Sequence, residues 1–180
     1  MITLQQLQEI FEHQTSLARK FHPNELVNGY TPPTWPVNIN RSSGQDRLRQ
    51  FAWWITEEYA EFMSADEEDK PEELADMLHF AVEIQLNCGF TAACIKGHVE
   101  NETTSPTPTD ALVELGRAMN LLKKKPWKLK PKDTDPDAFK FRLTRFLNHL
   151  LQAFDHLGYD AYDLYFKKKR INEQRIADGV

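Results

Sequence analysis

Two short acidic clusters contain the residues of this sequence that are best suited to chemistry. The first is Glu57, Glu58 and Glu61, and the second is Glu73 and Asp76. Residues three apart on a helix are neighbours, so Glu58 pairs with Glu61 and Glu73 with Asp76 if both segments are helical. Carboxylates so close together repel one another unless a cation lies among them. Oxygen ligands without Cys or His favour Mg²⁺ or Mn²⁺, which usually bind together with phosphates.

Apolar residues around both clusters recur at the spacing of a buried helical stripe. This predicts one helix over about residues 45–65 and a second that begins near Pro71 and ends at Gly89, with Gln85 as a polar exception in its stripe. Two such helices, packed antiparallel across the connection at 66–70, would direct four carboxylates into one crevice. A solvated acidic face is the alternative, because most soluble helices show charged surfaces.

One aromatic residue lies beside these carboxylates. Trp54 shares a helical side with Glu58 and Glu61, at i, i+4 and i+7. Its indole would give a base or a sugar a surface to rest on, and a purely structural tryptophan is the alternative.

The composition indicates one globular domain that spans residues 1–180. The chain has 41% hydrophobic residues and a net charge of −5, which argues against a general nucleic-acid binder. No apolar run approaches the ~18 residues of a membrane span, and no signal peptide is recognisable. Cys88 and Cys94 match no zinc spacing, so we interpret them as reduced core thiols. We expect a cytoplasmic protein with no membrane and no nucleic-acid partner.

The remaining segments predict further helices and two loops. Helices are expected over 3–21, 91–99 and about 110–125, after Asp135-Pro136, and from Asp160 to the end. Residues 22–43 lack periodicity and contain four prolines and Trp35, which predicts a long loop that covers a ligand or packs over the core. The basic loop 123–132 would meet phosphate or be solvated.

The acidic clusters, read together, resemble the all-α nucleoside triphosphate pyrophosphatases, which include MazG-like proteins and the dimeric dUTPases. The stretch from Glu73 to Phe80, ELADMLHF, is similar to the dimeric dUTPase form of the second acidic motif. The closing motif of that family is matched at four positions of the last helix. These are Lys168, Asn172, Arg175 and Gly179. Three positions depart from the family pattern, namely Lys169, Ile176 and Val180, and they bear on the base preference.

The resemblance implies an all-α fold, a compact bundle of about six or seven helices that forms a homodimer. It implies Mg²⁺-dependent hydrolysis of a deoxynucleoside triphosphate, first of all dUTP, to the monophosphate and pyrophosphate. The implied metal ligands are Glu58, Glu61, Glu73 and Asp76, and Glu58 or Glu57 would take the proton from water.

Substrate contacts also follow from the resemblance. In the family, a glutamine of the first helix contacts uracil, and Gln14 occupies that position, with a surface glutamine as the alternative. Lys168 and Arg175, together with Arg142 or Arg145, would hold the phosphates, and Asn172 would meet a base or sugar edge. Another substrate, dCTP or a purine nucleotide, and a non-catalytic helical binding or scaffold protein stay open as alternatives.

An internal echo relates the two halves of the chain. At an offset of 69 residues, Glu73 aligns with Arg142, and Asp76 aligns with Arg145. The apolar frame recurs while the acids are replaced by arginines. We therefore expect a metal-binding half at about 1–99 and a degenerate second half at about 110–180, with coincidence between two apolar helices as the alternative.

Overall fold

The chain folds into helices throughout the part that the computed structural model describes, residues 1–29, 34–96, 105–124, 129 and 132–179. These residues form seven α-helices and no strand, which confirms the all-α prediction. The helices are α1 (Leu4–Val27), α2 (Ser42–Ser64), α3 (Lys70–Asn87), α4 (Ala92–Lys96), α5 (Pro108–Leu121), α6 (Pro136–His156) and α7 (Ala161–Asp178). Part of the loop at 22–43, most of the basic loop at 123–132 and Val180 lie outside the described residues.

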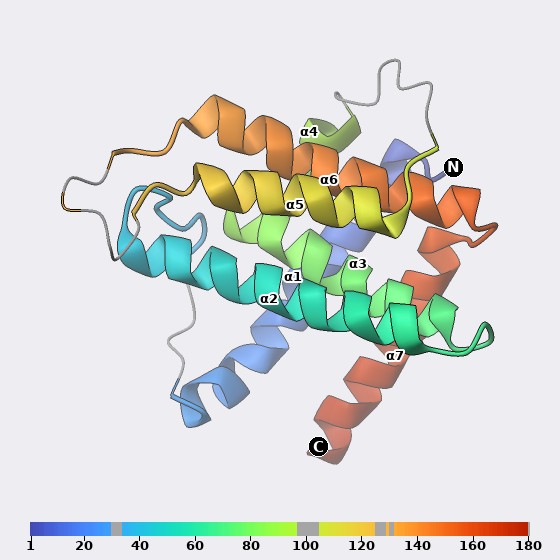
Figure 1. Ribbon diagram of the computed structural model, residues 1–180. Coiled ribbons are helices and arrows are strands. Elements are labelled where there is room, and N and C mark those ends of the chain that lie inside the picture. The colour runs from blue at the N-terminus through green and yellow to red at the C-terminus, as the bar shows by residue number, and fades with distance from the viewer. Residues whose placement is uncertain (30–33, 97–104, 125–128, 130–131, 180) are drawn as a thin grey trace.

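Helix α3 is the centre of the bundle. It packs along α2 and also contacts α1, α6 and α7. Helices α1 and α7 contact each other as well. Figure 1 shows the α2–α3 pair below the α5–α6 pair, with the far ends of α1 and α7 extending away from both. One hydrophobic cluster takes buried side chains from all seven described helices. The two acidic motifs therefore lie on adjacent helices, one of which is held on several sides.

Local sequence signals fix several of the helix ends. The carboxylate of Asp135 accepts backbone N–H groups of the first turn of α6, and that of Asp160 does the same for α7. Gly89 follows the end of α3 with φ 72°, in the left-handed region that favours glycine. These three signals were read correctly from the sequence. No described helix is both long and apolar enough to cross a membrane.

The end predicted for the first helix is wrong. Helix α1 does not stop near residue 21 but continues through Pro23 to Val27. Proline lacks the N–H of one intrahelical bond, which costs stability in a helix interior. Tertiary contacts hold the extra turn, because Glu25 forms an ion pair with Arg47 of α2, and His22 packs edge-on against Trp35. The loop is correspondingly shorter than expected. The helix expected at 110–125 likewise ends earlier, at Leu121.

The polar exception in the stripe of α3 has a structural reason. Gln85 is fully buried, and its Nε2 donates a hydrogen bond of 2.8 Å to the Leu143 carbonyl oxygen of α6. The side chain therefore joins the two halves of the bundle. A buried amide of this kind needs such a partner to offset its desolvation.

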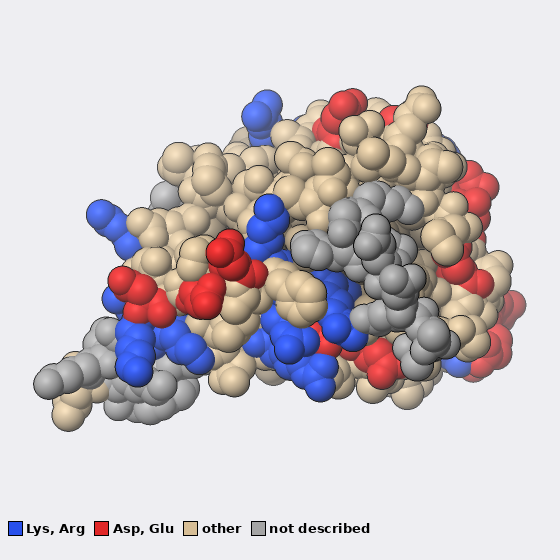
Figure 2. Space-filling model, turned by 90° about the horizontal axis from the view of Figure 1, so that it is seen from above, with Lys and Arg blue, Asp and Glu red and all other residues tan. Residues whose placement is uncertain are grey.

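The arginines of the second half surround a buried carboxylate. Glu114 of α5 is 2% exposed and lies 3.0 Å from Arg142 Nη1 and 3.6 Å from Arg145 Nε. Despite burial, hydrogen bonds from Arg117 and Arg142 lower the pKa of Glu114. Figure 2, which views the molecule from above the orientation of Figure 1, shows Lys and Arg side chains gathered near the middle of the visible face. A mixed ion cluster thus stands where the first half has acids, and the duplication itself stays a prediction.

Candidate active site

Three carboxylates from α2 and α3 meet in what we call the acidic cluster: Glu58, Glu73 and Asp76. One carboxylate oxygen of each lies within 4.8 Å of the others. All three are partly buried. Glu61, one turn after Glu58, lies close enough for its charge to act on Glu58 and Glu73, whereas Glu57 is exposed. The structure thus brings three of the four expected ligands together and keeps the fourth beside them.

The charges of the cluster are poorly compensated. Burial and the neighbouring charges of Asp76, Glu61 and Glu73 raise the pKa of Glu58 to about 7. Burial also raises the pKa of Glu73 and that of Asp76. Carboxyl groups behave in this way when like charges share a site. An all-oxygen donor set that resists carrying several negative charges fits a hard divalent cation, which would favour the ionised forms.

Lys168 of α7 supplies positive charge to one edge of this cluster. Its Nζ lies 2.6 Å from Asp76 Oδ2 and donates to Glu72 Oε1 at 2.7 Å. Although burial opposes the charge, these two hydrogen bonds raise the pKa of Lys168, and the same contact lowers the pKa of Glu72. Glu72 was not among the site residues expected from the sequence. Its position four residues before Asp76 on the same helix would have indicated it.

A pocket of about 370 Å³ opens from the acidic cluster into the space between α1, α2, α3 and α7. Six residues selected from the sequence line it: Gln14, Trp54, Glu58, Asp76, Asn172 and Arg175. Arg142 and Arg145 are not among its lining residues and bind Glu114 instead. The pocket therefore joins the acid motifs to the closing motif of the chain.

The side walls of the pocket are aromatic. The ring of Trp54 meets Phe51 edge-on, with centroids 5.1 Å apart, and Phe80 at 5.5 Å with an interplanar angle of 37°. Such a surface suits a flat heteroaromatic ring, because aromatic groups stack on one another over these distances. Trp54 has both the packing role and an accessible face on the pocket.

The deep end of the pocket is polar, and most of it was not expected from the sequence. Gln14 Nε2 donates to Glu83 Oε2 at 3.1 Å, and Gln14 Oε1 lies 2.9 Å from both Tyr165 Oη and His79 Nδ1. Burial lowers the pKa of His79 to about 4 and raises that of Glu83 to about 7. The signal for Glu83 was its spacing, since it follows Asp76 by seven residues and shares its helix face.

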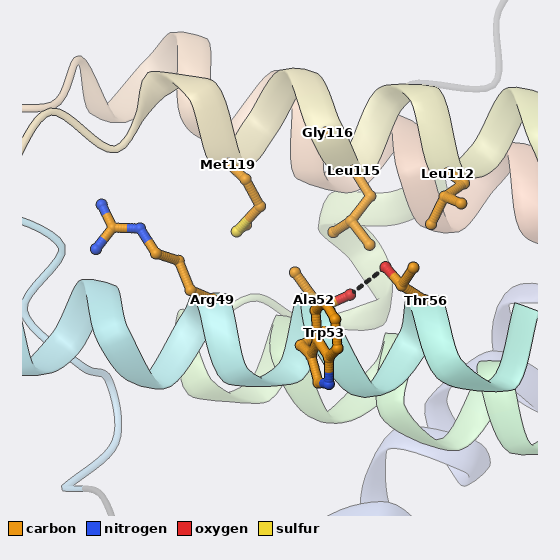
Figure 3. Close-up of a pocket in the computed structure, with 8 residues that line it drawn as sticks. All are labelled: Arg49, Ala52, Trp53, Thr56, Leu112, Leu115, Gly116 and Met119. Carbon is orange, nitrogen blue, oxygen red and sulfur yellow. Dashed lines mark hydrogen bonds between the residues drawn. The ribbon is translucent and has the colours of Figure 1, made fainter. Parts of the chain in front are cut away.

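A second groove lies between α2 and α5 and has a different character. Figure 3 shows Leu112, Leu115 and Met119 directed from α5 toward Ala52 and Thr56 of α2. The Thr56 hydroxyl donates to the Ala52 carbonyl oxygen at 2.8 Å, which leaves the wall apolar.

The edge of this groove carries Trp53, which is 64% exposed. Arg49, the charged residue of its lining, is already bound to Asp46, Gln45 and the Lys124 carbonyl oxygen. Nothing in this lining suits a metal ion or a phosphate.

Comparison with known proteins gives one result. A family model described as dUTPase matches residues 6–179. No curated protein and no solved structure matches the chain.

Proposed function

We propose, because the chain belongs to the dUTPase family, a residue-level account of how it hydrolyses dUTP to dUMP and pyrophosphate. The observation that carries it is the pocket in which the acidic cluster, an aromatic wall and two residues of the closing motif meet. The length of this pocket suits a nucleotide. Asp76 and Glu83 are seven residues apart on α3, about 10 Å along the helix, so phosphates and base can bind at opposite ends.

The metal site is the first element of this proposal. Glu58, Glu73 and Asp76 bind Mg²⁺, and Glu61 completes the set from the adjacent turn of α2. Support comes from the 4.8 Å grouping of the oxygens and from the raised pKa values of the cluster. When bound, such an ion would neutralise negative charge that develops on the phosphates and would lower the pKa of a nearby water.

Glu58 is the candidate general base. It lies in the acidic cluster and lines the pocket, which places its carboxylate to accept a proton from a water bound there. Glu57 is exposed and outside the cluster, so it is the weaker of the two candidates. The attacking water loses a proton to Glu58 while its oxygen forms a new bond to phosphorus of the anhydride between the α- and β-phosphates. The P–O bond of that anhydride breaks, and dUMP and pyrophosphate are released.

The remaining contacts hold the substrate. Lys168 lies within hydrogen-bond distance of Asp76, where phosphates and metal must meet, and Arg175 lines the same pocket. Both therefore bind the phosphates by charge-assisted hydrogen bonds. Trp54 stacks on the base, and Gln14 and Asn172 contact its polar edges or the sugar.

Pyrophosphate release with each dNTP, with and without Mg²⁺, tests this account. We expect dUTP to be hydrolysed fastest and only with divalent metal. Asp76→Asn preserves the side-chain shape and should lower kcat on the order of a hundredfold. Asp69→Asn, at an exposed aspartate one residue before α3, is the matched control. Full activity of Asp76→Asn would remove the metal site, and an inactive wild type would favour the binding-protein alternative.

The groove between α2 and α5 supports a homodimer as the assembly. Its apolar wall and the exposed indole of Trp53 suit a second copy of this chain better than a small charged ligand. We place the protein in the cytoplasm, and its two free cysteines fit a reducing compartment.

A further inference from the structure

The polar deep end of the pocket has a fixed hydrogen-bonding pattern. Gln14 is 3% exposed, and both sides of its Oε1 are occupied, by the Tyr165 hydroxyl and by His79 Nδ1, each at 2.9 Å. The ring of His79 also stacks on that of Tyr165, with centroids 4.2 Å apart. These three side chains thus hold one another in place, because a rotation of any of them breaks a buried hydrogen bond.

The same contacts determine what the wall can offer to a ligand. An amide nitrogen carries two hydrogens, and Gln14 Nε2 gives one of them to Glu83 Oε2 at 3.1 Å. Its acceptor oxygen is already used, so Gln14 can only donate. Within the described part of the chain, no group donates to Glu83 Oε1. The wall therefore presents an N–H donor next to a carboxyl acceptor.

We propose that Glu83 is a specificity-determining residue that accepts the N3–H of uracil, while Gln14 donates to a carbonyl oxygen beside it. Uracil has an N3–H donor between two carbonyl acceptors, which is the complement of this wall. Cytosine has a bare lone pair at N3, and this would face a lone pair of the ionised Glu83 carboxylate without a hydrogen between them. The proposal rests on the proposed function and deepens it, since it names the base that the site selects and the residue that selects it.

Two further features support this assignment. Glu83 lines the same pocket as Trp54 and Phe80, so a base that lies against these rings can reach it. Burial raises the pKa of its carboxyl to about 7, although Gln14 and Arg47 oppose the rise. A hydrogen-bond donor from the ligand stabilises the ionised carboxylate. The N3–H of the base would supply this donor to Glu83.

The test exchanges the acceptor for a donor. In Glu83→Gln, the new side chain uses its oxygen to accept from Gln14 and turns its N–H toward the base. We expect kcat/KM for dUTP to fall about ten- to hundredfold, because one paired contact to a base discriminates by about this factor. The ratio of kcat/KM for dUTP to kcat/KM for dCTP should fall at least as much. The change should appear mainly in KM, because the base lies far from the bond that breaks.

Controls separate this inference from loss of the fold and from failure of the proposed function. Glu83→Leu removes the acceptor without introducing a buried donor, and it should also lose selectivity. Glu12→Gln is the matched exchange at an exposed site on α1 and should keep the wild-type ratio. Circular dichroism and stabilisation by Mg²⁺ report on the fold and on the acidic cluster.

The outcomes are distinguishable. Wild-type protein that releases no pyrophosphate from dUTP contradicts the proposed function. Active wild type with folded Glu83 variants that keep the wild-type preference for dUTP over dCTP overturns the role of Glu83 and leaves the proposed function intact.

Discussion

At the scale of single residues, the site is a set of charges that lack full compensation. Lys168 neutralises one edge of the acidic cluster through Asp76 and Glu72, yet the pKa of Glu58 still rises to about 7. One ammonium group is therefore too little for the carboxylates around it. In the proposed metal site, a divalent cation would supply the missing charge, so that metal binding, protonation and stability would depend on one another.

This linkage predicts a pH-dependent effect of metal. The folded metal-free protein keeps protons on Glu58 and Glu83 up to about pH 7, whereas the unfolded chain, in which a glutamate has its ordinary pKa of 4.5, loses them at lower pH. The free energy of unfolding should therefore fall as the pH rises through this window. The pKa of Glu173 is lowered to about 2, so its stabilising contribution is lost only at more acidic pH.

Because Mg²⁺ requires ionised ligands, it should raise Tm more at about pH 8 than at about pH 5. Thermal melts with and without MgCl₂ measure this difference. An equal rise at both pH values would contradict the assignment of the acidic cluster as the metal site, and Asp76→Asn should show a much smaller rise at either pH.

At the scale of elements, α3 and α7 build the site between them. Helix α3 presents Asp76, His79 and Glu83 at i, i+3 and i+7, which places the acidic end and the base end of the pocket on one face. Helix α7 crosses it with Tyr165 and Lys168 buried and with the closing residues at the pocket wall. Neither helix forms the pocket alone, since each supplies groups that only the other can satisfy.

The role of α7 predicts a position-dependent effect of charge removal. Arg175→Ala removes a charge-assisted contact to phosphate, a kind worth about 1.5–3 kcal/mol. Steady-state kinetics should show a loss in kcat/KM on the order of ten- to hundredfold. Lys167→Ala and Arg170→Ala remove exposed charges from the same helix and should change little beyond the salt dependence. Equal losses of kcat/KM in all three variants would mean that α7 acts only as a diffuse basic surface.

At the scale of the whole molecule, the described residues form an apolar groove between α2 and α5 (Figure 3), and its lining shares no residue with the pocket at the acidic cluster. Trp53 and Trp54 are adjacent in sequence, so they point to different sides of α2. Trp54 contributes to the pocket, and Trp53 is left exposed. In the proposed homodimer, α2 would contact the substrate on one face and a second copy of the chain on the other.

The homodimer proposal predicts a defined response to Trp53→Asp. An anchoring tryptophan contributes about 2 kcal/mol or more to an interface, so the dimer Kd should rise on the order of thirtyfold or more. Sedimentation measures this as a shift toward the 21.0 kDa monomer. Met63→Asp, at another exposed apolar residue of α2 outside the groove, is the control. Wild type that sediments only as a monomer at micromolar concentration would contradict the proposal.

The sequence by itself determined the fold class and the acid pairs. Helical spacing is a local property, so the stripe around Phe51 and the neighbouring positions of Glu73 and Asp76 could be read directly. The end signals at Asp135, Asp160 and Gly89 are local as well. The motif resemblance then joined the acids to Asn172 and Arg175, and both line the pocket with them.

Only the tertiary structure decided which groups satisfy one another across helices. The continuation of α1 through Pro23 depends on the Glu25–Arg47 ion pair, which joins two helices and has no local signal. The contact of Lys168 with Glu72 spans 96 residues, and that of Gln14 with Glu83 spans 69. Periodicity places a side chain on a face, but its partner, and hence its charge state, is set by the helix that packs against that face.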